Sequence, residues 1–382
     1  MMIKTESVVL EIDKKLDLLV KKVELLNYIN PLNIEEERKK FFESNFTKNP
    51  EFIYPKLDFD AFDLQRQLFS LKIELIEDDI IRNLYEDIIY EYSGLIECIA
   101  TIGKGKKFYY NSLRSFGTPT EIDVENAKFI LHFNDEIDIE KSLPRFDVDE
   151  TEKLFREYSK QYDFTYEIKH SDKLSAIAMV LSNDKKLVLN KNHTFSQSDI
   201  DILVNHEIGI HMVTTMNAEN NKLKIFSHGF PNNVETQEGL AVLSEYMSDS
   251  ITLERLKILA YRVIAVNSLE KGYDFTQTFK LLHSNYNLSK DNAFKITLRV
   301  HRGGGFTKDY LYLTGLKKVY DYYKENKDLD VLLVGKTTLE YADEISYLIN
   351  NNFANSIKYK PNSYNFNNCS KKTVNFILNT LK

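Results

Sequence analysis

The stretch Asn205-His206-Glu207-Ile208-Gly209-Ile210-His211 places two histidines around a glutamate inside an apolar segment. Zn²⁺ binds imidazole nitrogens and carboxylate oxygens, and a site with three protein ligands leaves one position for water. Zinc lowers the pKa of that water towards neutrality, and a glutamate beside the first histidine can take its proton. The segment therefore predicts His206 and His211 as zinc ligands and Glu207 as general base. A solvated or merely hydrogen-bonded role for the histidines remains the alternative.

The spacing of the two histidines is unusual, because they lie five residues apart rather than four. On a regular α-helix four residues rotate a side chain by about 40° and five by about 140°, so five would place the rings on different faces. A π-bulge absorbs one extra residue and is frequent at functional sites. Gly209 lies between the histidines and eases such a distortion. We expect a π-bulge or local unwinding between Glu207 and His211.

A third ligand is expected from Thr236-Gln237-Glu238-Gly239-Leu240-Ala241, which opens a helix running through Tyr246. A carboxylate on a second helix, some two dozen residues after the second histidine, is the arrangement found in many zincins. Glu238 is therefore the predicted third ligand, with Glu235 and Glu245 as rivals. Glu245 is seven residues further on and shares the face of Glu238, so it is expected to orient a histidine. A surface or capping role for Glu245 stays open.

The residues ahead of the histidines predict a small sheet and a helix start. Phe164–Ile168 is expected to be a strand, and the stretches 175–181 and 186–190 flank the turn residues 182–184 as a hairpin. Ser196 and Asp199 form a capping box in which Asp replaces the usual Glu, so a helix should begin near Ser198.

The first part of the chain reads as helical. Apolar residues at three- and four-residue spacing predict an amphipathic helix over residues 5–27, a second helix over 33–45, and one or two long helices over 61–101. The acidic stretch 134–140 is expected to be a loop. We place a domain boundary near residue 145, with an N-terminal helical region over 1–145 and a catalytic domain over 146–382. The fold class is α+β and mostly helical, with a small mixed sheet.

Composition narrows the classes of function. The 382 residues are 43% hydrophobic and 28% charged, with a formal net charge of −7, as expected of a globular chain. An acidic chain without a basic cluster is a poor candidate for binding nucleic acid. No apolar run reaches the roughly 20 residues that span a bilayer, and the N-terminus lacks a signal-peptide core. We expect a cytoplasmic protein without a membrane segment. Cys98 and Cys369 are too few for a disulfide framework.

Three motifs occur in order along the chain: His-Glu-Ile-Gly-Ile-His (206–211), Thr-Gln-Glu-Gly-Leu-Ala (236–241) and Gly-Gly-Phe-Thr-Lys-Asp (304–309). Together they resemble the MATCAP-like tyrosine carboxypeptidase family, whose bacterial members are often called QEGLA-motif proteins. The first motif is similar to HEIGTH, with Ile210 where Thr is common. The third continues through Tyr310, Tyr312 and Gly315 in the manner of that family. The resemblance covers roughly residues 60–360.

This resemblance implies a zinc carboxypeptidase that removes a C-terminal residue, tyrosine or another aromatic, from peptides or proteins. It implies zinc ligation by His206, His211 and Glu238, with Glu207 as catalytic glutamate. It also implies a zincin-like fold, in which a strand beside the active-site helix holds the substrate, and the strand at 186–190 is our candidate. The tubulin specificity of eukaryotic members does not transfer, because it depends on surfaces that this chain need not share.

A carboxypeptidase needs cations to recognise a free carboxylate, preferably a bidentate Arg. We expect Arg302 and Lys308 to form this clamp, with Arg299 as a weaker candidate. Tyr310, Tyr312 and His301 are candidates for stabilising the oxyanion of the tetrahedral intermediate. A solvated or packing role is the alternative for each of these residues.

Other functions stay open at this stage. The chain could be a zinc endopeptidase or amidase, or a regulatory protein that keeps the fold and performs no hydrolysis. The intact Glu207 argues against the last reading. The first 60 or so residues could dock a partner. The sequence does not give the substrate or the oligomeric state.

Overall fold

The computed structural model describes residues 2–134, 145–172, 174, 176–365 and 369–382. Helices dominate this part of the chain, and two small sheets lie within residues 145–196. The mostly helical α+β class expected from the sequence is confirmed, whereas a zincin-like fold stays a prediction. The expected loop at 134–140 falls, apart from Asn134, outside the described residues.

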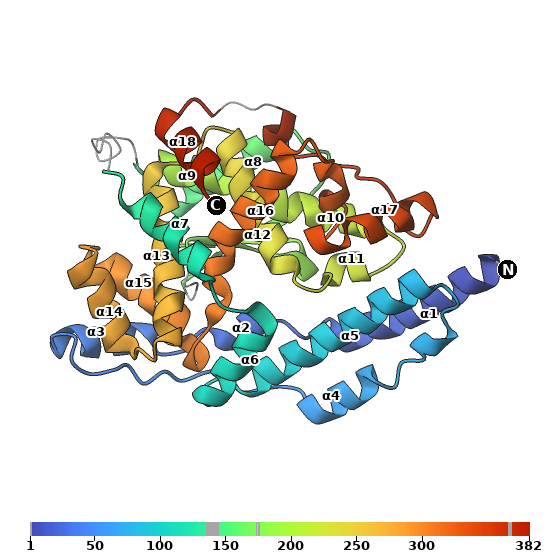
Figure 1. Ribbon diagram of the computed structural model, residues 1–382, viewed down its shortest axis with the longest axis horizontal. Coiled ribbons are helices and arrows are strands. Elements are labelled where there is room, and N and C mark those ends of the chain that lie inside the picture. The colour runs from blue at the N-terminus through green and yellow to red at the C-terminus, as the bar shows by residue number, and fades with distance from the viewer. Residues whose placement is uncertain (1, 135–144, 173, 175, 366–368) are drawn as a thin grey trace.

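The connections between the helices that precede residue 135 are short, except for the long segment 44–60 between the third and the fourth helix (Figure 1). The bounds of these helices are α1 (Met2–Val20), α2 (Leu25–Ile29), α3 (Ile34–Glu43), α4 (Ala61–Leu68), η1 (Ile73–Leu75), α5 (Asp79–Ala100), α6 (Lys106–Phe116) and α7 (Glu121–Leu131). The helix expected over residues 5–27 is thus two helices. They are separated by a turn in which Val23 N donates to Val20 O and Glu24 N donates to Lys22 O.

The first helix is bound to the rest of the molecule by Asp13 of α1. Its carboxylate accepts hydrogen bonds from Lys224 N at 2.6 Å and Ile225 N at 3.2 Å, at the start of α11 (Ile225–His228), and from the Tyr85 hydroxyl of α5 at 2.9 Å. Burial raises the pKa of Asp13, against the opposing effect of these hydrogen bonds. Four apolar side chains on the same helix enter the main core: Val9, Ile12, Leu16 and Val20. Helix α1 is therefore built into the fold, and the division near residue 145 stays a prediction.

The sheets occupy residues 145–196. Their strands are β1 (Arg145–Phe146), β2 (Glu167–Ser171), β3 (Ala178–Leu181), β4 (Lys186–Asn190) and β5 (Phe195–Ser196), and α8 (Val148–Ser159) lies between the first two. Strand β4 pairs in parallel with β2 and antiparallel with β3, while β1 pairs antiparallel with β5. The expected hairpin around residues 182–184 is confirmed, and the small sheet is mixed.

The strand that we expected to hold substrate is the wrong one. Strand β4 is the central strand of its sheet, so β2 and β3 already occupy both of its edges. Only a strand with an open edge can pair with an added peptide. Within the described residues β3 is the edge strand on the side of the histidine motif, and its Val180 N donates to Glu207 Oε2 at 3.1 Å.

The rest of the described chain is helical. Its elements are η3 (Ser182–Asp184), α9 (Gln197–Leu203), η4 (Val204–Met212), α10 (Val213–Glu219), α12 (Asn233–Met247), α13 (Leu253–Glu270), α14 (Phe275–Lys280), η5 (Leu281–Asn285), α15 (Lys290–His301), η6 (Arg302–Gly304), η7 (Thr307–Tyr310), α16 (Leu311–Lys324), η8 (Leu329–Leu333), η9 (Leu339–Tyr341), α17 (Ala342–Asn350), η10 (Asn362–Asn365) and α18 (Lys372–Thr380). A large core joins these helices to α1 and α5, and a smaller core packs the sheet against α8, α9 and η4. None of the described helices combines the length and apolar character needed to cross a bilayer.

Helices α12 and α16 cross in the middle of the molecule at two glycines (Figure 1). A Cβ on Gly239 would lie 2.4 Å from the carbonyl of Gly315, and a Cβ on Gly315 would lie 2.1 Å from Glu235 O. The two backbones therefore touch directly, at a distance that no side chain permits. This close approach places the start of α16 next to Glu238.

We expect Gly239→Ala to destabilise the protein by about 1–3 kcal/mol or more, because the added methyl group must push two helices apart. Gly94→Ala is the matched control, since Gly94 lies inside α5 and a Cβ there would meet only Ser115 Oγ at 3.6 Å. That control should be neutral or stabilising by up to about 1 kcal/mol. Urea unfolding of both variants measures the difference. Equal stability of the two variants would contradict the packing described here.

Candidate metal centre

The helix that carries the histidine motif begins at the predicted capping box. Ser196 Oγ accepts a hydrogen bond from Asp199 N at 3.1 Å, and Asp199 Oδ2 accepts one from Ser196 N at 2.9 Å. The start of α9 is therefore fixed by local side chains. From there the chain runs without interruption into η4.

The segment η4 is a π-helix of nine residues, Val204–Met212. The distortion predicted between Glu207 and His211 is confirmed, and it extends over the whole motif. In a π-helix the backbone hydrogen bonds join residues five apart, so residues five apart share a face. The rings of His206 and His211 accordingly lie together, with centroids 4.9 Å apart.

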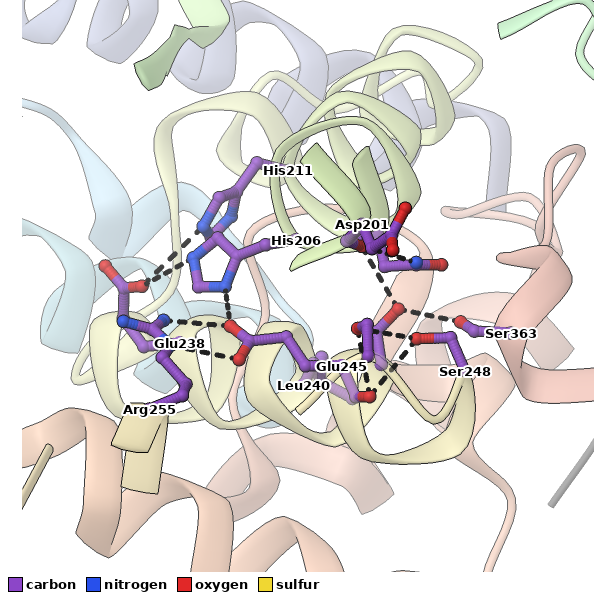
Figure 2. A network of polar contacts seen from close by, with 12 residues as sticks. Asp201, His206, His211, Glu238, Leu240, Glu245, Ser248, Arg255 and Ser363 are labelled. Atoms are coloured by element: carbon purple, nitrogen blue, oxygen red, sulfur yellow. Dashed lines mark hydrogen bonds and ion pairs between the residues drawn. The ribbon is translucent and has the colours of Figure 1, made fainter. Parts of the chain in front are cut away.

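Glu238 of α12 faces both rings. Its Oε2 lies 3.5 Å from His206 Nε2 and 3.6 Å from His211 Nε2 (Figure 2). These three residues form a cluster that could hold a metal ion, with ligand atoms within 4.8 Å of one another. The structure thus brings together the three residues predicted as ligands, from two different helices.

The unpartnered oxygen of Glu238 shows that this cluster fits a cation. Glu238 Oε1 accepts a hydrogen bond from Lys308 Nζ at 3.0 Å, but Oε2 is buried without a hydrogen-bond partner among the described residues. A buried carboxylate oxygen without a partner is costly. Tetrahedral zinc with bonds of about 2.0–2.1 Å separates its ligand atoms by about 3.3–3.4 Å, close to the two distances from this oxygen to the imidazoles.

Glu245 fixes the orientation of the first histidine. His206 Nδ1 lies 2.8 Å from Glu245 Oε1, so Nε2 is the nitrogen turned towards Glu238 (Figure 2). Arg255 of α13 holds Glu245 in turn, with Nε 3.0 Å from Oε2 and Nη2 2.8 Å from Oε1. A carboxylate on the distal nitrogen of a metal-binding histidine sets its tautomer and raises its basicity. This is the position expected for Glu245 from its spacing on the helix.

The charges in the cluster depend on one another. Burial alone would lower the pKa of His206, but the carboxylates of Glu238 and Glu245 raise it to about 9. Burial alone would raise the pKa of Glu238, but Lys308 and the two imidazoles hold it well below its usual range. Without a metal, His206 is therefore a cation between two carboxylates.

Glu207 lies on the wall of a cavity of about 570 Å³ that also reaches His206. Residues 176–178, leading into the edge strand β3, line the same cavity, together with Tyr312. Glu207 Oε2 is held by Val180 N, whereas Oε1 has no hydrogen bond within the described residues. One carboxylate oxygen is thus fixed, and the other is available to a molecule in the cavity.

Of the residues predicted to bind substrate, some line the cavity and others do not. Tyr312 and Arg299 line the cavity; the Tyr312 ring lies parallel to that of His206 at 6.4 Å, and Arg299 is paired with Asp309. Lys308 contacts Glu238 instead of the cavity wall. Arg302, the other half of the expected clamp, donates from Nη1 to Asn30 Oδ1 at 2.7 Å and does not line the cavity.

Two further candidates also point away from the cavity. The Tyr310 hydroxyl donates to Phe116 O at 2.8 Å, and His301 Nε2 lies 2.8 Å from Thr278 Oγ1. Both residues serve packing between helices in this structure. The clamp of Arg302 with Lys308 and the oxyanion roles of Tyr310 and His301 are therefore not supported by the geometry.

Two arginines of α13 were missed in the sequence. Arg255 and Arg262 both line the cavity and lie seven residues apart, on one face of the helix. The other residues around them are largely apolar and buried. Charged residues are seldom placed on a buried helix without a role, so this pattern was the available signal.

A family model described as microtubule-associated tyrosine carboxypeptidase matches residues 39–382. The chain belongs to this family. The match to the tyrosine carboxypeptidase family is wider than the three motifs, since it begins in α3 and includes α18. It covers η4, α12 and the segment before α16, so every residue of the metal cluster lies within it.

The chain is also similar to a Mus musculus protein named putative tyrosine carboxypeptidase MATCAP2. The two are 24% identical over 345 residues, which is 87% of this chain and 58% of the mouse protein. The chain therefore spans less than two thirds of the length of that relative. Membership of the tyrosine carboxypeptidase family is established for the region that carries the cluster, and the name of the family implies a peptidase.

We expect Glu238→Gln to abolish stoichiometric zinc binding, because the amide offers a neutral and weaker ligand. Glu235→Gln is the matched control, since Glu235 lies on the same helix but pairs with Lys318 at 2.6 Å. Elemental analysis after dialysis against buffered zinc measures the metal content. Loss of metal from the Glu235 variant with retention in the Glu238 variant would contradict the ligand set.

We expect the affinity for zinc to rise with pH up to about 9. Below that pH the His206 ring carries a proton in the metal-free protein, because its pKa is raised to about 9. A metal ion must displace this proton, so the apparent affinity should fall by up to about tenfold for each pH unit below 9. Competition with a chelator between pH 7 and 9.5 measures it. An affinity independent of pH across this range would show that the ring is already neutral.

Proposed function

We propose that this chain is a zinc-dependent carboxypeptidase that releases a C-terminal residue, tyrosine or another aromatic, from peptides or proteins. The observation that carries the proposal is the buried Oε2 of Glu238. Within the described part of the chain this oxygen lacks a hydrogen-bond partner, and it faces two imidazole nitrogens beside the cavity that Glu207 lines. Membership of the tyrosine carboxypeptidase family supports the reaction class.

The residues that would hold zinc are His206, His211 and Glu238. When bound, zinc supplies Lewis acidity that polarises a carbonyl oxygen and makes a water molecule more acidic. His₂Glu donor sets accept several divalent ions, and the nitrogen-rich donor set here suits zinc. Glu245 and Arg255 keep the His206 ring in the orientation that this requires.

Glu207 is the general base in this proposal. Its Oε1 takes a proton from the attacking water and afterwards returns it to the leaving amine. Val180 N holds the other oxygen, which limits the freedom of the carboxylate and keeps it beside the edge strand. A substrate main chain that pairs with β3 would therefore pass Glu207.

Tyr312 is the candidate for stabilising the developing oxyanion. Its ring is stacked on His206, it lines the cavity, and its hydroxyl makes no hydrogen bond within the described residues. A hydroxyl at this position can donate to a charge that appears only during the reaction. Apolar side chains at the cavity wall, from Leu203, Ile258 and Ile296, suit an aromatic side chain of the departing residue.

We expect Glu207→Gln to retain zinc and to lower turnover by at least about 10²-fold, because the amide cannot accept the proton. Glu254→Gln is the control, as Glu254 of α13 lines the same cavity but is not one of the three residues of the metal cluster. Metal content and kcat are measured on the same preparations. Full turnover in the Glu207 variant would remove it from the mechanism.

Incubation of the protein with a peptide library, followed by mass spectrometry, should show the loss of single C-terminal residues. We expect aromatic residues, tyrosine above all, to be over-represented among those released, and a chelator to stop the reaction. Cleavage inside the peptides, or cleavage that resists the chelator, would count against the proposal.

A further inference from the structure

Three cations at or beside the cavity are paired with carboxylates. Arg255 pairs with Glu245, Arg299 with Asp309, and Lys308 with Glu238. Arg262 of α13 lines the same cavity, yet it makes no ion pair or hydrogen bond within the described residues. Its Nε is buried without a partner, and its guanidinium carbon lies 4.8 Å from the centre of the Tyr312 ring.

An unpaired guanidinium in such a place is unfavourable for folding. Burial and the neighbouring charge of Arg299 lower the pKa of Arg262 to about 10, against the opposing charge of Asp309, so the group still carries its charge at neutral pH. A face-on contact with Tyr312 offsets part of the cost of removing this charge from water, but it offers no acceptor for the N–H groups. A ligand that brings a carboxylate into the cavity would satisfy both the charge and the hydrogen bonds.

The position of Arg262 also suits the end of a peptide. Tyr312 contacts both Arg262 and the His206 ring, so the guanidinium shares an immediate neighbour with the candidate metal ligand. In a C-terminal residue only three covalent bonds separate the scissile carbonyl carbon from the carboxylate carbon. A group that binds this carboxylate must therefore lie a few ångströms from the reacting bond.

We propose that Arg262 binds the α-carboxylate of the C-terminal residue of the substrate and thereby restricts cleavage to the last peptide bond. The inference rests on the proposed function, which identifies the carboxylate as the C-terminus of a peptide. The unpaired guanidinium of Arg262 indicates where that carboxylate binds. Arg262 thus takes the role that the sequence suggested for Arg302 and Lys308, whose side chains are engaged elsewhere.

The test compares two peptides of one sequence, one ending in tyrosine and the other in tyrosine amide. The wild type should prefer the free acid by at least about 100-fold in kcat/KM. Arg262→Gln should bring kcat/KM for the acid to within about threefold of that for the amide, mainly through a higher KM for the acid. Arg262→Lys keeps the charge and the contact with Tyr312 but loses bidentate geometry, so it should fall between the two.

Lys295→Gln is the matched control, because it removes a positive charge from the same cavity wall. It should keep the preference for the acid to within about threefold, as expected when an exposed, screened charge is lost. An equal loss in the Lys295 variant would mean that the general field of the cavity, not Arg262, selects the acid, and would overturn the proposal. A preference that survives in Arg262→Gln would overturn it as well.

A binding measurement separates this inference from the hydrolase proposal. N-acetyltyrosine should raise the thermal midpoint of the wild type, N-acetyltyrosine amide should not, and the acid should have no effect on Arg262→Gln. That variant should itself be folded, since it loses an unpaired charge. Acid binding through Arg262 without any hydrolysis would leave the carboxylate site standing and end the hydrolase proposal. Hydrolysis of both peptides at equal rates, with no acid-specific binding, would end the proposal for Arg262 and leave the hydrolase proposal standing.

Discussion

The constraint on which the centre of this molecule depends is the burial of the Glu238 carboxylate. A carboxylate removed from water is stable only with cations or hydrogen-bond donors around it. The chain supplies Lys308 on one oxygen and turns two imidazoles towards the other. Two features of the backbone make these contacts possible. The π-helix aligns the histidines, and the contact between Gly239 and Gly315 brings the segment before α16 close enough for Lys308 to reach Glu238.

The same helix carries a second carboxylate that acts on the same imidazole. Glu238 and Glu245 lie two turns apart on α12 and approach opposite nitrogens of His206. Their combined negative charge is balanced by Arg255 and Lys308. The site is thus a compact set of alternating charges, in which one member cannot be neutralised without shifting the proton affinity of the next.

Local patterns explain which parts could be predicted from the sequence. The capping box at Ser196, the hairpin over 178–190 and the distorted helix at 204–212 all follow from residues that are neighbours in the chain. The approach of Glu238 to the histidines followed from motif spacing.

Distant contacts explain the rest. The side chain of Arg302 turns towards Asn30, more than two hundred residues earlier, and no pattern in the residues around Arg302 predicts that partner. Whether β3 or β4 has the open edge depends on the parallel pairing of β4 with β2, which spacing alone does not reveal. A specific role for the arginines of α13 could not be predicted, because it depends on a cavity that they line together with residues from other parts of the chain.

The π-helix has an effect beyond the histidines that it aligns. Its extra residue shifts the phase of everything that follows in α10 by one residue step, about 100° around the axis. Asn217 lies on that continuation, where its amide group joins the end of η8 to the segment at Tyr359 by donating to Leu333 O and Tyr359 O and accepting from Tyr359 N. A single-residue deletion that restored ordinary helical winding would turn the Asn217 side chain away from Leu333 and Tyr359. The winding of the histidine motif is thus coupled to the packing of the chain at Leu333 and Tyr359.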